Sequence, residues 1–370
     1  MKLICSKSNL LKGVNIVSKA VPSKTTMSIL ECILIDASTN EIKLTANDME
    51  LGIETKIEGE IEQKGIVAVD AKVFAEIVRK LPDNVITIES NSNYQISITC
   101  EKANFHISGK SGEDFSYLPY IEKNDFLCIS QFTLKELIRQ TIFSIADNDN
   151  NKLMTGELFE VHDSELKVVS LDGHRISIRK VELKESYPDR KVVVPGKSLQ
   201  EISKILSGEV EDEVHIFFTG NHIVFEFDTT TVVSRLIEGE YFKINQMLSN
   251  DYETKFFINK KEFLSCIDRA TLLVKEGDKK PIIFHVTDSN MEIKINSQLG
   301  SMKEDIDIEK EGKDIMIGFN PKFLIDALRV IDDENITIYM VNPKAPCYIR
   351  DEEEKYIYLI LPVNFNAAAV

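Results

Sequence analysis

Basic residues recur along the chain at a fixed spacing, and positively charged side chains are the kind that contact phosphate groups. Successive members of the set Lys72, Lys197 and Lys322 are 125 residues apart, and so are those of the set Arg79, Lys204 and Arg329. Each lysine of the first set forms a pair with the basic residue seven positions after it. Residues seven apart lie on one face of a helix, so each pair would present two charges together. In a chain of net charge −16, this threefold repetition favours a nucleic-acid contact.

An ordinary solvated helix face is the alternative interpretation of these basic pairs. An acidic residue precedes each second basic residue by three positions, at Glu76, Glu201 and Asp326. Acid–base pairs at this spacing are common on exposed helices, where they form salt bridges. For a single helix this alternative would be preferred, and the repetition is what favours the phosphate-binding interpretation.

His174 beside Asp172 is a second group with possible chemistry, because a carboxylate can orient a histidine that acts as a base. The two residues share one short turn, and no nucleophile elbow, phosphate-binding loop or metal-ligand spacing accompanies them. The remaining histidines stand singly: His106, His162, His215, His222 and His285. The sequence therefore predicts a protein that is not an enzyme and that has no cofactor and no metal.

Each basic pair belongs to a short apolar strand, a turn and an amphipathic helix. The three copies are Val67–Leu81, Val192–Leu206 and Ile315–Ile331. In the first copy Phe74 and Val78 form an apolar face opposite Lys72. The repeat of about 125 residues predicts three domains, 1–123, 124–250 and 251–370, with short polar joints at 122–125 and 248–254.

The first half of each repeat also recurs, as a leading helix followed by alternating strands. The expected leading helices are Ser6–Ala20, Thr133–Ala146 and Asn259–Val274. They carry further basic residues: Lys12, Lys19, Lys135, Arg139, Lys261 and Arg269. Hairpins are expected after the second helices, pairing Val85–Ile88 with Gln95–Thr99, Val214–Phe217 with Ile223–Phe227, and Ile336–Met340 with Tyr356–Leu361. The fold class is therefore α+β, with two helices packed on antiparallel sheets in each domain.

Composition limits the partners and the compartment. Asp and Glu number 60 against 44 Lys and Arg, which argues against a surface that is basic all over. The six cysteines show no CxxC spacing, which is typical of reduced thiols. No signal peptide or membrane span is expected, so we predict a soluble cytoplasmic protein. If the domains form an arc with the helices on its inner side, the local charge there is positive and suits duplex DNA.

Four motifs in order carry a family resemblance: Thr155–Gly156 before Leu158–Glu160, Leu171–Ile176, Ser234–Gly239 and Tyr358–Pro362. With the threefold repeat, the chain resembles the bacterial sliding clamps, the beta subunits of DNA polymerase III, over essentially all 370 residues. The resemblance implies the DNA-clamp fold and a homodimer that closes head to tail into a ring around duplex DNA. It also implies a non-catalytic processivity role. A protein-interaction scaffold that does not encircle DNA is the alternative.

The resemblance further implies an apolar cleft between the second and third domains, in which polymerase, clamp-loader and repair proteins insert short linear peptides. The implied cleft residues are Met154, Leu171, Gly173, His174, Arg175, Ile176, Phe242, Gln246, Met247, Leu359, Leu361 and Pro362. Phe242, Gln246 and Leu361 stand where the family usually has proline, arginine and methionine, so peptide preference is expected to differ. A structural loop pair that holds neighbouring strands is the alternative for His174 and Arg175.

Two further sets follow from the resemblance. DNA-facing positions beyond the helices are Lys24, Asn148 and Lys152, where Lys152 lies one residue after the position at which most clamps carry arginine. The implied dimer contact pairs Phe105 and Ile107, on an edge strand, with Leu272 and Leu273 at a helix end.

Overall fold

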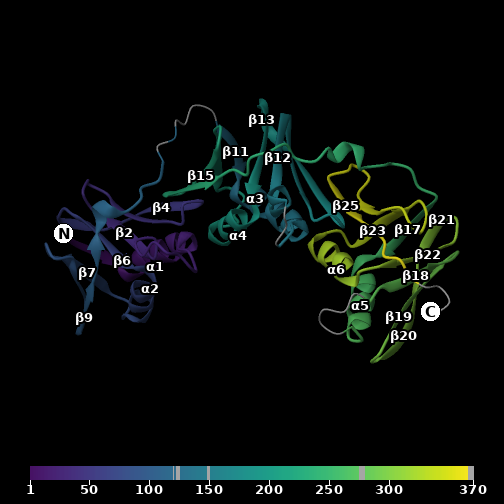
Figure 1. Cartoon of the computed structure of the whole chain (residues 1–370), viewed down its shortest axis with the longest axis horizontal. Coiled ribbons are helices and arrows are strands. Elements are labelled where there is room, and N and C mark those ends of the chain that lie inside the picture. Colours follow the sequence, from purple (N-terminus) through teal and green to yellow (C-terminus); the bar gives the residue numbers. More distant parts are fainter. Residues whose placement is uncertain (120, 122–125, 148–150, 275–279, 366–370) are drawn as a thin grey trace. The chain divides into compact units, whose positions relative to one another are not determined.

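The computed structural model describes residues 1–119, 121, 126–147, 151–274 and 280–365 (Figure 1). The chain forms two compact units. Unit one consists of Met1–Lys135 with Lys197–Leu236, and unit two consists of Glu136–Gly196 with Ile237–Val370. Both are built from antiparallel sheets and helices, as the α+β prediction requires.

Six α-helices occur in the described chain, in the positions that the repeat predicts: α1 Lys7–Val17, α2 Ala71–Lys80, α3 Gln131–Thr141, α4 Gly196–Ile205, α5 Lys260–Thr271 and α6 Pro321–Val330. Polar residues start several of them. Asp70 accepts from the backbone N–H of Val73 (2.8 Å), and Asn320 accepts from that of Lys322 (3.1 Å). These caps satisfy N–H groups that have no partner within the helix, and Pro321 occupies the first helical position, where no donor is needed.

Unit one holds two sheets. The five-stranded sheet has the order β5 Glu60–Gln63, β1 Lys2–Ser6, β7 Val85–Ser90, β8 Gln95–Cys100 and β9 Ala103–Ser108. The nine-stranded sheet has the order β10 Lys110–Ser111, β6 Ile66–Asp70, β2 Cys32–Asp36, β3 Ile42–Asn47, β4 Leu51–Ile57, β16 Thr230–Arg235, β15 His222–Phe227, β14 Glu213–Phe218 and β11 Phe126–Ser130. Helix α1 packs beside α2 and against β3 and β4 (Figure 1).

Unit two also holds two sheets. The seven-stranded sheet has the order β12 Gly156–Leu171, β13 Arg175–Pro195, β25 Tyr356–Ile360, β24 Cys347–Arg350, β23 Asn335–Met340, β17 Thr254–Asn259 and β21 Glu309–Gly312. The four-stranded sheet has the order β20 Gly300–Asp307, β19 Asn290–Ser297, β18 Ile282–Val286 and β22 Ile315–Phe319. Helix α5 packs beside α6, and their apolar faces join one buried core with these sheets.

The strand pairing differs from the predicted hairpins in one place. The hairpins β7–β8 and β14–β15 form as predicted. The predicted pairing of Ile336–Met340 with Tyr356–Leu361 is wrong, because β24 lies between β23 and β25 and pairs with both. Cys347–Arg350 is a short segment without clear alternation, so its place in the sheet depends on partners distant in the sequence.

Two strand pairs continue a sheet from one sequence repeat into the next. Strand β4 pairs with β16 within unit one, from Leu51 opposite Ser234 to Thr55 opposite Thr230. Strand β13 pairs with β25 within unit two, from Arg175 opposite Ile360 onward. Neither unit therefore coincides with a predicted domain, and the boundaries at 123 and 250 stay predictions.

The cysteines and helices bear on the other expectations from composition. None of the six cysteines, all of which the structure describes, forms a disulfide, and Cys128 alone among them is not fully buried. Among the described helices, none combines the length and the hydropathy needed to cross a membrane.

Candidate functional site

The turn at Asp172–Arg175 links β12 to β13 and is held by its own aspartate. The Oδ1 atom of Asp172 accepts from the backbone N–H groups of His174 (2.9 Å) and Arg175 (3.1 Å). Gly173 has φ +84°, a left-handed conformation that glycine adopts without steric cost. This is a tight turn whose geometry requires aspartate followed by a residue that tolerates positive φ.

The equivalent turn in the first repeat has the same geometry. Asp48 Oδ1 accepts from Glu50 (3.0 Å) and Leu51 (2.7 Å), and Met49 has φ +75°. The two turns thus share a backbone conformation and differ in sequence. The repeats therefore differ here in residue type, at Gly173, His174 and Arg175, and not in backbone conformation.

Arg175 is buried and bonded within unit two. Its guanidinium donates to Asp172 Oδ2 (2.9 Å), to Asp326 Oδ2 on α6 (2.7 Å) and to the carbonyl oxygen of Phe143. The group also lies 4.6 Å from the ring centre of Phe323 and 5.4 Å from that of Phe143. With its side chain only 7% exposed, Arg175 joins the turn to α6. These contacts favour the structural alternative for this residue.

His174 has the opposite setting, because its side chain is exposed. Its ring centre lies 6.0 Å from that of Phe323, and its carbonyl oxygen accepts from the backbone N–H of Leu361 (2.8 Å). The carboxylate of Asp172 is occupied by backbone N–H groups and by Arg175, so it does not orient the imidazole. The arrangement gives no support to a base with its orienting carboxylate.

Apolar residues from several segments of unit two meet beside this turn. Leu171, Ile176 and Leu359 are buried in one cluster, against which Met154 and Phe242 pack. Met247 and Leu361 are 45% and 37% exposed, so apolar surface continues from this cluster to solvent. Gln246 is exposed and Pro362 is half-buried. We call these residues, together with Gly173 and His174, the apolar cluster.

The basic residues of the helices are mostly at the surface. Eleven predicted positions are exposed: Lys12, Lys24, Lys72, Arg79, Lys152, Lys197, Lys204, Lys261, Arg269, Lys322 and Arg329. Lys19, Lys135 and Arg139 are half-buried, and Asn148 lies outside the described residues. Lys135 donates to the carbonyl oxygen of Leu206 (3.2 Å) beyond the end of α4, and Arg139 bonds Glu136 and Asp332. Lys135 and Arg139 are thus weaker candidates for an external partner.

Two of the three ion pairs that the alternative interpretation predicts are present among the described residues. Arg79 pairs with Glu76 (2.5 Å) and Lys204 with Glu201 (2.7 Å). The third differs, because Arg329 pairs with Asp268 and Asp326 pairs with Arg175. Lys197 pairs with Asp48, and Arg269 pairs with Glu304. Six exposed lysines form no ion pair with any residue that the structure describes: Lys12, Lys24, Lys72, Lys152, Lys261 and Lys322. Their charge is available to an outside partner.

Comparison with known proteins identifies the family. Three family models match in order along the chain: the N-terminal (1–119), central (128–243) and C-terminal (245–364) domains of the DNA polymerase III beta subunit. A beta sliding clamp from Staphylococcus epidermidis is 31% identical over 98% of this chain and 99% of its own length. This chain belongs to the beta sliding clamp family. Clamps are non-catalytic and confer processivity on DNA polymerase.

Solved structures agree with this assignment. A crystal structure from Eubacterium rectale, described as a DNA polymerase III beta subunit, matches with a TM-score of 0.97 at 73% identity, covering 99% of this chain and all of that one. The DNA polymerase sliding clamp of Bacillus subtilis matches with a TM-score of 0.95 at 35% identity, with the same coverage. The predicted clamp fold is confirmed.

The predicted dimer residues of the clamp lie at accessible places. Strand β9 is an edge strand of the five-stranded sheet, and Phe105 on it is 39% exposed. Leu272, at the end of α5, is 78% exposed, and Ile107 and Leu273 are half-buried. An unpaired edge with exposed apolar side chains is a surface that another chain can cover.

One feature of the clamp has no counterpart in the sequence prediction. Glu157, on β12, is completely buried, and among the described residues neither carboxyl oxygen has a hydrogen-bond partner. Burial raises the pKa of Glu157 to about 8. Phe159 and Val161 follow it at alternate positions and share its face of the strand, and this spacing was the available signal that Glu157 points inward.

Proposed function

We propose that two copies of this clamp close head to tail into a ring around duplex DNA, and that the clamp holds the DNA by enclosure. Retention by enclosure needs only weak attraction to phosphate, because tight binding would prevent sliding. The proposal includes the 15 predicted DNA-facing positions, among which the six unpaired lysines are the strongest candidates.

The position of the lysines within their helices carries this proposal. The second residue of α2, α4, α5 and α6 is a lysine: Lys72, Lys197, Lys261 and Lys322. A cation is disfavoured in the first turn of a helix by the macrodipole. These lysines therefore do not stabilise their helices through it. The N-terminal end of a helix, with its free backbone N–H groups, also attracts phosphate. The charge of the lysine and the helix end would therefore attract a DNA phosphate together.

We further propose that partners dock on the apolar cluster through short linear peptides. The replicative polymerase, the clamp loader and repair proteins are the partner classes, and the cytoplasm is the compartment. Exposed Met247 and Leu361 beside the buried wall of Leu171, Ile176 and Leu359 support apolar anchoring of a peptide. Phe242 and Gln246 would change which peptide sequence the cluster prefers.

Retention on circular DNA tests the ring. The clamp is loaded on nicked circular duplex, which is then cut once. Release on cutting is the expected result, whereas persistence on linear DNA would show ordinary binding and would favour a scaffold that does not enclose DNA.

Charge reversal tests the phosphate contacts. Changing Lys72, Lys197 and Lys322 to glutamate should lower retention on the circle several-fold, because each change turns attraction into repulsion. In the matched control, Lys64, Lys102 and Lys344, which are exposed outside the helices, are changed to glutamate. The net charge then falls by the same amount. Equal loss in both variants would mean that net charge alone acts, and unchanged retention would remove the electrostatic argument.

A further inference from the structure

We propose that Cys128, Glu213 and His215 form a binding site for Zn²⁺. The three residues lie within unit one, on β11 and β14. They take no part in the DNA, peptide or dimer contacts proposed above. The site is therefore an additional property of this chain and stands independently of the ring.

Strand pairing places the three side chains on one face. Cys128 on β11 stands directly opposite His215 on β14, and Glu213 is two residues before His215 on the same strand. Side chains of alternate residues share a face, and directly opposed residues are close neighbours. One ligand atom from each residue lies within 4.8 Å of the other two, and His215 Nε2 is 4.0 Å from Glu213 Oε2.

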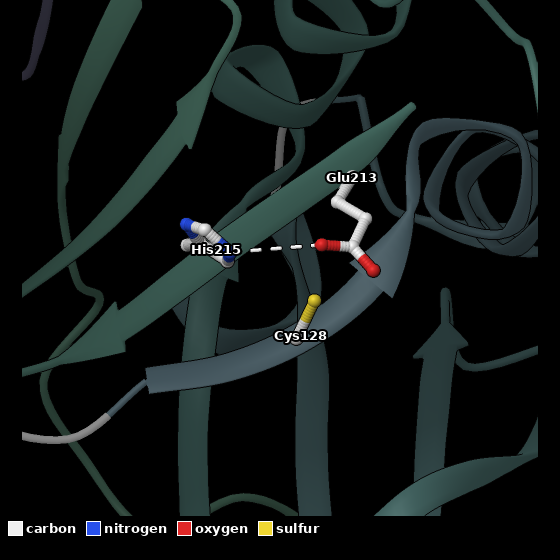
Figure 2. A group of neighbouring side chains, drawn as sticks. All are labelled: Cys128, Glu213 and His215. Atoms are coloured by element: carbon white, nitrogen blue, oxygen red, sulfur yellow. Dashed lines mark ion pairs between the residues drawn. The ribbon is translucent and has the colours of Figure 1, made fainter. Parts of the chain in front are cut away.

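The directions of the side chains agree with a shared ion. Figure 2 shows the sulfur of Cys128 pointing toward the space between the imidazole of His215 and the carboxylate of Glu213. Around a tetrahedral zinc ion, with bonds of about 2.0–2.3 Å, ligand atoms are roughly 3–4 Å apart. Small side-chain rotations would close the present spacing to that range without moving either strand.

The chemistry of the donors selects the ion. Cys128 would bind as a thiolate, releasing its proton to solvent, and His215 would bind as neutral imidazole. Sulfur, nitrogen and carboxylate oxygen together suit Zn²⁺, whereas Mg²⁺ and Ca²⁺ prefer oxygen donors alone. Three protein ligands leave one of four positions open to water.

The surroundings favour a built site over a chance contact. The ring of Phe126 packs 4.5 Å from that of His215 and 5.6 Å from that of Phe217, which restrains the imidazole. Cys128 and His215 are half-buried and Glu213 is exposed, so an ion can enter from solvent. Since β11 is the edge of the nine-stranded sheet, an ion would tie this edge strand to β14.

Cobalt titration of the full-length protein tests the site. After chelation and reduction, the wild type should bind one Co²⁺ per chain with a sulfur-to-cobalt charge-transfer band, and Zn²⁺ should displace the cobalt. Cys128→Ser should abolish the band, and His215→Ala should weaken binding by about tenfold or more. His162→Ala is the matched control, because His162 forms an exposed pair with Asp189 (3.0 Å) on another sheet.

A second measurement avoids variants that fold poorly. The other five cysteines are buried, so alkylation of the folded wild type should modify Cys128 first. Zn²⁺ should slow this modification several-fold, as read by mass spectrometry of the peptide. Absence of the cobalt band in the wild type, its persistence in Cys128→Ser, or alkylation rates that ignore Zn²⁺ would each overturn the proposal.

Discussion

At the scale of single residues, Glu157 and Arg175 show two outcomes of burying a charged group. Arg175 has two carboxylate partners, a carbonyl oxygen and two aromatic rings around its guanidinium. Glu157 has no such partners, and the Thr141 hydroxyl donates to the carbonyl oxygen of Leu137 instead (2.6 Å). Because a buried charge without partners is costly, Glu157 holds its proton at neutral pH, which its raised pKa expresses.

Replacing Glu157 with glutamine should change how stability depends on pH. The pKa of Glu157 is about 8 in the folded protein, against an ordinary value of 4.5. Between these values the folded state holds a proton that the unfolded state has lost, so the free energy of unfolding falls as pH rises. Glu157→Gln should remove this decline in the free energy of unfolding, which amounts to ~3–5 kcal/mol by pH 8. Urea unfolding of both proteins from pH 4.5 to pH 8 measures the difference.

Glu160, on the same strand, provides the control for this measurement. Although burial opposes the effect, Lys167 and Lys191 lower the pKa of Glu160. Its contribution to stability is therefore lost as pH falls, whereas that of Glu157 is lost as pH rises. Glu160→Gln should leave the decline between pH 4.5 and pH 8 in place. Parallel pH profiles for wild type and Glu157→Gln would contradict the assignment of a protonated Glu157.

At the scale of elements, the apolar cluster is assembled by pieces that are far apart in the chain. Pairing of Ile176 with Leu359 brings the strand after the turn beside β25. The hydrogen bond from Leu361 to His174 then continues this pairing to the end of the cluster. The contact of Arg175 with Asp326 adds α6. The cluster thus depends on backbone pairing, and its exposed side chains can change without disturbing its frame.

Truncating Leu361 and Met154 to alanine should weaken binding of a polymerase-derived peptide. Lost apolar anchors cost about 1–3 kcal/mol, and Leu361 is already partly exposed, so the fold should be little affected. Isothermal titration with the peptide provides the affinity. Leu299→Ala, an exposed leucine at the turn between β19 and β20, is the matched control. Full-strength binding by the double variant would place the peptide site elsewhere.

At the scale of the whole molecule, the edge of the five-stranded sheet at β9 is a surface that a second chain can cover. Phe105 on edge strand β9 and Leu272 after α5 are apolar groups that water surrounds in a single chain. In a head-to-tail dimer, Phe105 of each chain would meet Leu272 of the other. The dimer would therefore have two such contacts, and both side chains would be buried in each of them. Burial of such side chains is worth roughly 25 cal/mol per Å² of apolar surface removed from water.

Introducing a charge at this edge should therefore separate the chains. Phe105→Asp or Leu272→Asp should shift sedimentation from dimer toward monomer, with the dissociation constant raised at least tenfold. Val210→Asp, at another exposed apolar position, is the control and should leave the dimer intact. Sedimentation that is unchanged in both edge variants would contradict the proposed contact.

The sequence by itself determined the repeating elements and the family. Helices α2, α4 and α6 and the turn at Asp172 follow from local features: apolar spacing, and glycine at a position with positive φ. Local features of this kind act between residues close in the chain. The basic pairs and their possible acidic partners at three residues' distance were predictable for the same reason.

Only the tertiary structure decided which strands pair and which polar side chains are buried. The insertion of β24 between β23 and β25, the pairing of β4 with β16, and the burial of Glu157 and Arg175 all depend on segments far apart in sequence. Strand pairing satisfies backbone groups whichever suitable partner is used, so alternation alone does not name the partner. The same pairing brought Cys128 opposite His215, a juxtaposition that no motif in the sequence indicates.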